Sequence, residues 1–347
     1  MGADQAISSA TRLRFNAMFA ADWLRRRPQN HGLRAERWAP IHDRLVRETE
    51  GLPDGRVEPV DRVRDLSPAE FYERYFVTGI PVVLEGAASH WPAAMKWTPD
   101  YLMRFCGDDE IDVLDGQRWT VASGRSAVVT TAESRLQVRE LMEVVKSGGA
   151  WYGAFLELLD KHADLRSDLD LSFVALYGHT RQQIPWQRHV LAKMYVGGPG
   201  TSTSFHCAGV SNLYVQAHGR KKWVLVQPEY TPLMYPAPQR GINWQSFVDF
   251  RDPDLTVCPL YRLADRRETI LEPGDVLWNP PFVWHGVANL TASIAVSLWW
   301  INVTRGFSNN FLFSALTLFG RPNPIAMQLG LGSRGGGKSA FAVHLNQ

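Results

Sequence analysis

The chain has 347 residues, of which 45% are hydrophobic and 21% are charged. This balance excludes a disordered chain, and no apolar run reaches the roughly 18 residues that a membrane helix needs. The net charge of +2 gives no electrostatic reason to expect nucleic acid as a partner. The three cysteines have no CxxC spacing, which argues against a disulfide framework or a zinc finger. Thirteen tryptophans stand out, and composition does not say whether they fill a core or line a pocket.

The N-terminal region predicts a helical extension over residues 1–55. Phe15, Phe19 and Trp23 recur at helical spacing, and the basic run Arg25-Arg26-Arg27 follows them. We expect this helix to dock on its own domain, and contact with a membrane surface or a partner is the alternative. Because the N-terminus lacks the apolar segment of a signal peptide, we expect a cytoplasmic protein with no membrane partner.

Helix and strand signals alternate after Asp61. Ser67-Pro68-Ala69-Glu70 is a capping box, and Thr98-Pro99-Asp100 begins another capped helix. A short buried strand is predicted at 81–84, and a helix at 138–145 ends at Gly148-Gly149.

Short strands dominate after residue 190 and predict an antiparallel barrel or sandwich. They are expected near Ala192–Val196, Ser202–Cys207, Asn212–Ala217, Lys222–Val226, Asp275–Trp278 and Ser293–Trp300. The proline-bearing segment 229–270 is predicted to be an irregular insertion between strands.

An apolar helix candidate opens residues 306–347, and it either packs on the barrel or makes a homodimer contact. The tail stretch 332–339 formally matches a phosphate-binding glycine loop. Only eight residues follow Ser339, so we expect a flexible tail rather than a nucleotide site.

Two stretches carry the chemistry. One runs from Thr203 through His206 to Trp223, and the other runs from Pro273 to His285. The two histidines lie on or beside predicted strands, so they could converge on one metal inside a barrel. A lone histidine is more often a core or surface residue, and only the surrounding pattern singles out these two.

The region from about Asp61 to Trp300 resembles the JmjC/cupin-8 family of Fe(II)- and 2-oxoglutarate-dependent oxygenases. It resembles most the branch of the asparaginyl hydroxylase that inhibits hypoxia-inducible factor. The entry segment 79–86 and His90-Trp91-Pro92 share this resemblance. It implies a mainly β fold with α flanks, a double-stranded β-helix (jelly roll). The expected division is a helical extension at 1–55, a catalytic domain at 56–302 with barrel strands mainly at 190–302, and a C-terminal helix and tail at 303–347.

The resemblance also implies a cofactor site. His206 and His285 match the metal-binding histidines of the family, which bind Fe(II) and use O2. The residues that match 2-oxoglutarate contacts of the family are Lys221, Thr203, Asn212 and Tyr152. Lys222 is a rival to Lys221, since adjacent strand residues face opposite sides of a sheet.

The chain departs from the family at Ala208, where the family has a metal-binding Asp. We predict a halogenase in which chloride occupies the vacated ligand position and a C–H bond of the substrate is chlorinated. The first alternative is a hydroxylase or other oxygenase with a two-histidine iron site. The second alternative is a catalytically inactive binding protein.

The sequence leaves the substrate open between a small molecule and a peptide. Several tryptophans flank the motifs, and we expect Trp223, Trp278, Trp284, Trp299 and Trp300 to form barrel core and an apolar pocket wall that keeps water out.

Overall fold

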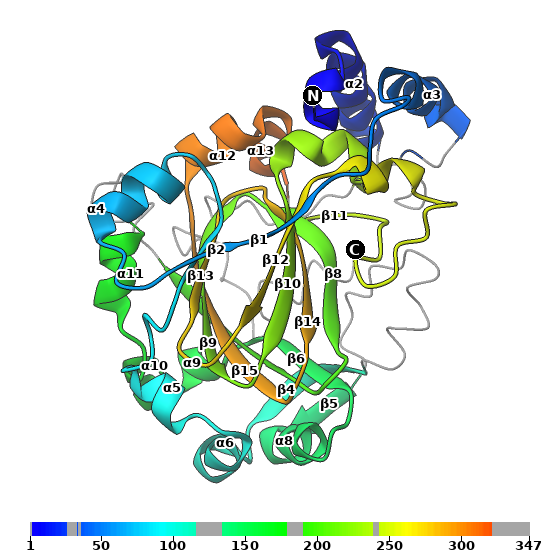
Figure 1. The fold of residues 1–347 in the computed structure, drawn as a ribbon. Helices are drawn as coiled ribbons and strands as arrows, with labels where there is room; N and C mark the ends of the chain where they lie inside the picture. The colour runs from blue at the N-terminus through cyan, green and yellow to red at the C-terminus, as the bar shows by residue number, and fades with distance from the viewer. Residues whose placement is uncertain are drawn as a thin grey trace.

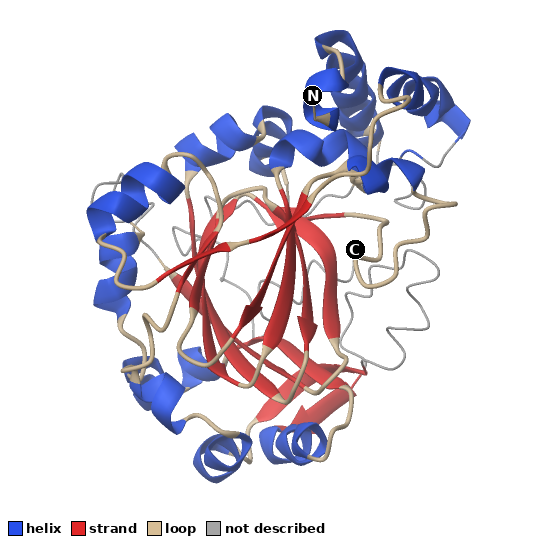
Figure 2. Cartoon of the chain, viewed as in Figure 1, coloured by secondary structure: helices blue, strands red, loops and turns tan. Residues whose placement is uncertain are grey.

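Two β-sheets packed face to face form the body of the protein (Figure 2). The computed structural model describes residues 2–25, 33, 36–115, 134–178, 190–238 and 243–320. Within these ranges one sheet has the strand order β1-β12-β10-β14-β8-β11, and the other has the order β2-β3-β13-β9-β15-β7-β6-β4-β5.

The first sheet, the six-stranded sheet, consists of β1 (Val57–Pro59), β12 (Arg266–Leu271), β10 (Lys221–Val226), β14 (Trp284–Asn289), β8 (Ser202–Ala208) and β11 (Asn243–Gln245). The second, the nine-stranded sheet, consists of β2 (Asp61–Val63), β3 (Val82–Leu84), β13 (Val276–Asn279), β9 (Val210–His218), β15 (Ser293–Ile301), β7 (Leu191–Gly197), β6 (Trp151–Leu156), β4 (Glu110–Asp115) and β5 (Ser134–Gln137).

The antiparallel ladders confirm the predicted jelly roll. Each of the six predicted strands after residue 190 is present with its ends shifted by no more than two residues. Only the pairs β1–β12 and β2–β3 are parallel among the described ladders, and both lie at sheet edges. In each sheet all other neighbouring strands are antiparallel, which is typical of a jelly roll.

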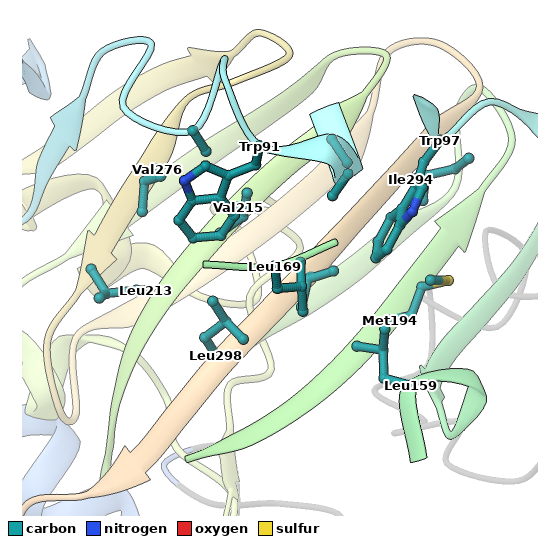
Figure 3. Close-up of a cluster of buried hydrophobic side chains, with 14 of the residues drawn as sticks. Trp91, Trp97, Leu159, Leu169, Met194, Leu213, Val215, Val276, Ile294 and Leu298 are labelled. Carbon is teal, nitrogen blue, oxygen red and sulfur yellow. The ribbon is translucent and has the colours of Figure 1, made fainter. Parts of the chain in front are cut away.

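Helices cover the outer face of the nine-stranded sheet (Figure 1). They are α4 (Pro68–Phe71) with the π-turn Tyr72–Phe76, α5 (Pro92–Lys96), α6 (Pro99–Cys106), α8 (Val138–Lys146), α9 (Leu158–Lys161), α10 (Ala163–Ser167) and α11 (Leu171–Tyr177). Their apolar side chains pack on outward-facing strand residues such as Leu213, Val215 and Leu298 (Figure 3).

The terminal helices cover the outer face of the six-stranded sheet. They are α1 (Ala3–Ala6), α2 (Ser9–Leu24), the 3-10 turn Glu36–Trp38, α3 (Ala39–Glu48) and α13 (Phe311–Leu318), together with the 3-10 turns Pro228–Leu233 and Pro259–Leu263. Helix α12 (Val303–Asn309) leads from β15 into α13. A third, smaller apolar cluster lies between the two sheets and includes Tyr214, Trp223 and Leu277. The space between the two sheets therefore contains both apolar and polar side chains.

The local signals read from the sequence are confirmed. Ser67 and Glu70 form a reciprocal capping box at α4, and the Thr98 hydroxyl accepts from the backbone N–H of Tyr101 at α6. The apolar face of α2 docks on its own chain, since the ring centroid of Phe19 lies 5.5 Å from Trp244 and 5.0 Å from Phe313.

The segment 229–270 is not merely an irregular insertion, and that prediction was wrong in part. Two strands arise from this region, β11, which pairs with β8, and β12, which pairs with β10. The hydrophobic and polar residues of β12 alternate only weakly, because its first three residues are charged and half-buried. The charged residues therefore mask the two-residue period of a strand.

The tryptophans divide between the two sides of the sheets. Trp223 faces the barrel interior, as does Trp299 by its register with Asn212. Trp278 and Trp300 pack under the helices outside the nine-stranded sheet, and Trp284 packs outside the six-stranded sheet. The expected pocket wall is therefore mostly outer core, because successive strand residues face opposite sides.

The C-terminal helix packs on the barrel. The ring of Phe313 on α13 stacks 4.5 Å from Trp244, whereas Phe311 is 71% exposed. The homodimer contact and the domain boundaries stay predictions, and the tail stretch 332–339 lies outside the described residues. Among the described helices, none combines the length and apolarity needed to cross a bilayer.

Replacing Phe313 by Ala is expected to reduce the free energy of unfolding by about 3–5 kcal/mol, because the ring fills the junction of α2, α13 and the sheet. Urea denaturation measures this loss. Phe311→Ala on the same helix is the matched control and is expected to change stability by less than about 0.5 kcal/mol. Equal losses for the two variants would contradict the packing described here.

Candidate functional site

Two histidines face each other on the inner side of the six-stranded sheet. His206 on β8 and His285 on β14 are register partners, and their ring centroids are 4.1 Å apart. Two imidazoles that bind one metal at right angles have ring centroids about 4–5 Å apart, given metal–nitrogen bonds of roughly 2.1 Å. The two residues that sequence analysis paired across 79 positions are thus brought into contact.

Backbone carbonyls fix the tautomer of both rings. Nδ1 of His206 lies 2.9 Å from the carbonyl of Ser204, and Nδ1 of His285 lies 2.9 Å from the carbonyl of Val283. A carbonyl only accepts, so each Nδ1 carries the proton and each Nε2 keeps its lone pair. Burial lowers the pKa of both rings, and the neighbouring His206 lowers that of His285 further. Neutral imidazoles of this kind are ready to bind a metal.

A β-bulge brings Thr203 to the same face as His206. Thr203 is the partner of Val287 and His206 is the partner of His285, so two residues of β8 oppose one residue of β14 between them. Strict alternation would place positions 203 and 206 on opposite faces. With the bulge, the Thr203 hydroxyl reaches the interior, where it lies 3.1 Å from the hydroxyl of Tyr152 on β6.

Lys221 is enclosed between the sheets. Its side chain is fully buried, and its Nζ donates a 2.7 Å hydrogen bond to the hydroxyl of Tyr214. The rings of Tyr152, Tyr195 and Tyr214 surround the ammonium, with centroids 5.8, 5.7 and 5.3 Å from Nζ. Burial lowers the pKa of Lys221 to about 7. No ion pair joins Lys221 to any carboxylate of the described residues.

The alternation of β10 places the two rival lysines on opposite faces of the sheet. Lys222 points to the outer side, where its Nζ lies 2.7 Å from a carboxylate oxygen of Glu268. Lys221 therefore lies in the interior with Trp223, whose ring stacks 5.4 Å from His285. Lysine and histidines face the same enclosed space from one sheet.

Asn212 joins this interior through residues that sequence analysis missed. Its Oδ1 accepts a 2.9 Å hydrogen bond from Ser297, and Ser297 also bonds to the Tyr195 hydroxyl. Tyr195, Tyr214 and Ser297 occupy inward positions of β7, β9 and β15. Strand alternation could have pointed to Tyr214, because it follows Asn212 by two residues on the same strand and both therefore face the same side of the sheet.

A glycine makes room for the tyrosine. A Cβ on Gly197 would lie 2.7 Å from the Tyr152 ring and 2.1 Å from Nδ2 of Asn289. Only glycine permits this approach, since such contacts are far shorter than van der Waals distance. Burial raises the pKa of Tyr152 to about 12, so its hydroxyl stays protonated and can donate.

Ala208 lies two positions after His206 on β8 and therefore on the same face. Its methyl group offers no donor atom to a metal. Its carbonyl accepts a 2.7 Å hydrogen bond from the N–H of Phe282, which has a φ of 63° at the turn before β14. The backbone at Ala208 thus tethers the turn that precedes β14, the strand that carries His285.

Another group of potential ligands lies outside the barrel. One donor atom each from Cys106, Asp109 and His162 lies within 4.8 Å of the others. His162 is hydrogen-bonded to Asp109, and Nζ of Lys161 lies 3.9 Å from the same carboxylate. The Asp109 carboxylate therefore already has two partners, while Cys106 is buried and Asp109 and His162 are half-buried.

Residues 68–305 match the family described as the cupin-like domain. The chain belongs to this family. It is 29% identical over 230 residues to lysine-specific demethylase 8 of Xenopus tropicalis, which covers 66% of the chain and 50% of the relative. Identity is 26% to Jumonji C domain-containing protein 5 of Drosophila melanogaster, with 67% of the chain and 57% of the relative covered.

A human relative is also similar, namely bifunctional peptidase and (3S)-lysyl hydroxylase JMJD7. It is 26% identical, and 67% of the chain and 81% of that protein are covered. The chain spans about half the length of the first two relatives. The resemblance to JmjC proteins is thereby confirmed at the level of the family.

Replacing Lys221 by Met is expected to raise the free energy of unfolding at pH 7 by about 2–4 kcal/mol in protein without ligands, because a buried amine without a counter-charge is removed. The folded-state pKa of about 7 lies below the usual 10.5. Stability should therefore rise with pH between about 7 and 10.5, and the variant should lose this slope. Urea denaturation across that range measures both effects.

The matched control is Lys222→Met, which alters an exposed ion pair and is expected to change stability by no more than about 1 kcal/mol. A loss of stability in Lys221→Met would show that the ammonium is compensated within the fold.

Proposed function

We propose that this protein is an Fe(II)- and 2-oxoglutarate-dependent oxygenase of the hydroxylase type. His206 and His285 would hold the metal, and Lys221, Thr203, Asn212 and Tyr152 would seat 2-oxoglutarate. The observation that carries the proposal is the buried ammonium of Lys221, which faces the same interior as the histidine pair without a carboxylate partner among the described residues.

The polar groups present fit both cofactors. An ammonium buried without a counter-charge is costly, and a carboxylate with hydroxyl donors beside it removes that cost. The hydroxyls of Tyr152, Thr203 and Tyr214 lie around Lys221 and can donate to such a group. Nε2 lone pairs of two neutral imidazoles suit a borderline metal such as Fe(II).

When bound together, Fe(II) and 2-oxoglutarate supply oxidation: 2-oxoglutarate and O2 yield succinate and CO2, and the second oxygen atom goes to a C–H bond of the substrate. The protein's residues contribute orientation and exclusion of water. The carbonyls of Ser204 and Val283 hold the imidazoles, while the ring of Trp223 covers His285 from within the barrel. An apolar ring against His285 limits the access of water to this side of the imidazole.

Relatives' names favour the hydroxylase alternative over the halogenase reading. Of the relatives described above, one is named a lysine-specific demethylase and another a bifunctional peptidase and (3S)-lysyl hydroxylase. We infer that the substrate is a side chain of a peptide or protein, and a small molecule is the alternative. An affiliation with the asparaginyl hydroxylase branch stays a prediction, as does a cytoplasmic location.

Halogenation remains a second candidate because of one observation. Ala208 lies beside His206 with a methyl group where a metal would otherwise find a carboxylate, so chloride could bind there. In that case Ala208→Asp is expected to favour hydroxylation over halogenation.

Anaerobic addition of Fe(II) and 2-oxoglutarate is expected to produce a metal-to-ligand absorption band, and oxygen is expected to release succinate. His285→Ala should abolish both, because it removes one of two metal ligands. A band that shifts with chloride, followed by a chlorinated product, would favour the halogenase. Binding of both cofactors without succinate release would favour the inactive binding protein, and absence of binding would refute the cofactor site.

The affinity for 2-oxoglutarate is expected to depend on pH through Lys221. Its pKa is about 7 without ligand, and a bound carboxylate raises it. The affinity should be constant just below pH 7 and fall up to tenfold per pH unit above it, because binding then requires a proton. Anaerobic calorimetry with Mn(II) in place of Fe(II) measures this slope.

Lys222→Met should keep the pH slope, whereas Lys221→Met should remove it and weaken binding by about 10- to 100-fold. A slope that persists in Lys221→Met would assign the proton to another group.

A further inference from the structure

Position 208, on the same face of β8 as His206, carries a methyl group and no oxygen donor. His206 and His285 supply nitrogen, and the next inward position of β8 is Ala208. Borderline divalent metals in oxygenases take a third protein ligand with oxygen. If the chain itself supplies that ligand, it must come from another strand.

Asn279 approaches the histidine pair from the opposite sheet. It is the last residue of β13 and the register partner of Asn212 on β9, which places it on the inner face. Its Nδ2 lies 3.2 Å from Nδ1 and 3.5 Å from Nε2 of His285, and the residue is 3% exposed. A buried amide thus contacts a proposed metal ligand from across the barrel.

The amide is not satisfied by the protein groups around it. Its Oδ1 is buried and has no hydrogen-bond partner among the described residues. Nδ1 of His285 already carries the proton that it donates to Val283, so an amide N–H directed at it has no acceptor there. Rotating the amide by 180° exchanges its two ends and still leaves one end unpartnered. An unpaired buried amide costs on the order of 1–3 kcal/mol.

We propose that Asn279 supplies, through Oδ1, the oxygen ligand that Ala208 does not provide. This inference rests on the metal site proposed above. The end of the amide that faces His285 lies 3.5 Å from Nε2, and exchanging the two ends of the amide would turn Oδ1 toward a metal held by that nitrogen. The ligand set is then two imidazoles and one carboxamide, all neutral, so the metal keeps its full double positive charge. That charge strengthens the attraction for the anionic 2-oxoglutarate or chloride and weakens retention of the metal.

A merely orienting role for Asn279 makes a different prediction. An amide that only holds the His285 ring would be needed whatever residue stands at 208. An amide that is itself a ligand becomes dispensable once a carboxylate is restored at that position. A double-mutant comparison separates these two roles.

The experiment uses the full chain and Co(II) alone as the probe, with affinity measured by calorimetry and coordination by the visible absorption of Co(II). Asn279→Leu is expected to weaken Co(II) binding by about tenfold or more and to change the absorption spectrum. Asn279→Asp, which is nearly the same shape, is expected to tighten binding by about tenfold. Adding Ala208→Asp to Asn279→Leu should restore the native affinity.

Asn289→Leu is the control, since it removes another buried inward amide that bonds to Thr201 rather than to a histidine. It should leave Co(II) affinity unchanged. Unchanged Co(II) affinity in Asn279→Asp, or no recovery of affinity in the double variant, would overturn the assignment of Asn279. In that case, Co(II) binding by the native chain and its loss in His285→Ala would still support the metal site. Absence of Co(II) binding by the native chain would overturn both.

Discussion

The main constraint on this structure is a lysine ammonium buried inside a barrel. Lys221 has no charged partner among the described residues, and the Tyr214 hydroxyl and three tyrosine rings lie against it. Such a group lowers the stability of the fold, so other packing must offset it. A carboxylate brought by a ligand would remove this cost. The protein is therefore expected to be most stable with an anionic ligand bound.

Apolar packing on the outer faces of the two sheets offsets the cost of burying Lys221. Large aromatic side chains, among them Trp278, Trp300 and Trp284, pack outside the sheets under helices, while the histidines and the lysine lie inside. The apolar core is thus divided into two outer layers, and the inner layer is left for polar residues. This arrangement explains the excess of tryptophan without requiring a tryptophan-lined pocket.

Much of the fold was predictable, because local periodicity and capping depend on neighbours in sequence. The site was predictable where strand parity applies, as for Lys221 against Lys222. Thr203 was predicted from the family resemblance, whereas strand parity alone would place it on the opposite face from His206, because its orientation depends on a bulge. Neither signal pointed to Asn279, which reaches His285 only when two sheets are packed together. Strand β12 was missed because its charged residues hide its alternation.

Titration of the Lys221 amine tests the central claim most directly. Two-dimensional NMR of protein labelled in lysine side chains, with Lys221→Met to assign the signal, follows its pKa with and without 2-oxoglutarate and Mg(II) or another diamagnetic metal. The pKa is expected near 7 in the free protein, as burial alone dictates, and well above that with 2-oxoglutarate bound. A pKa near 10.5 in the free protein, or one that 2-oxoglutarate does not move, would contradict the account.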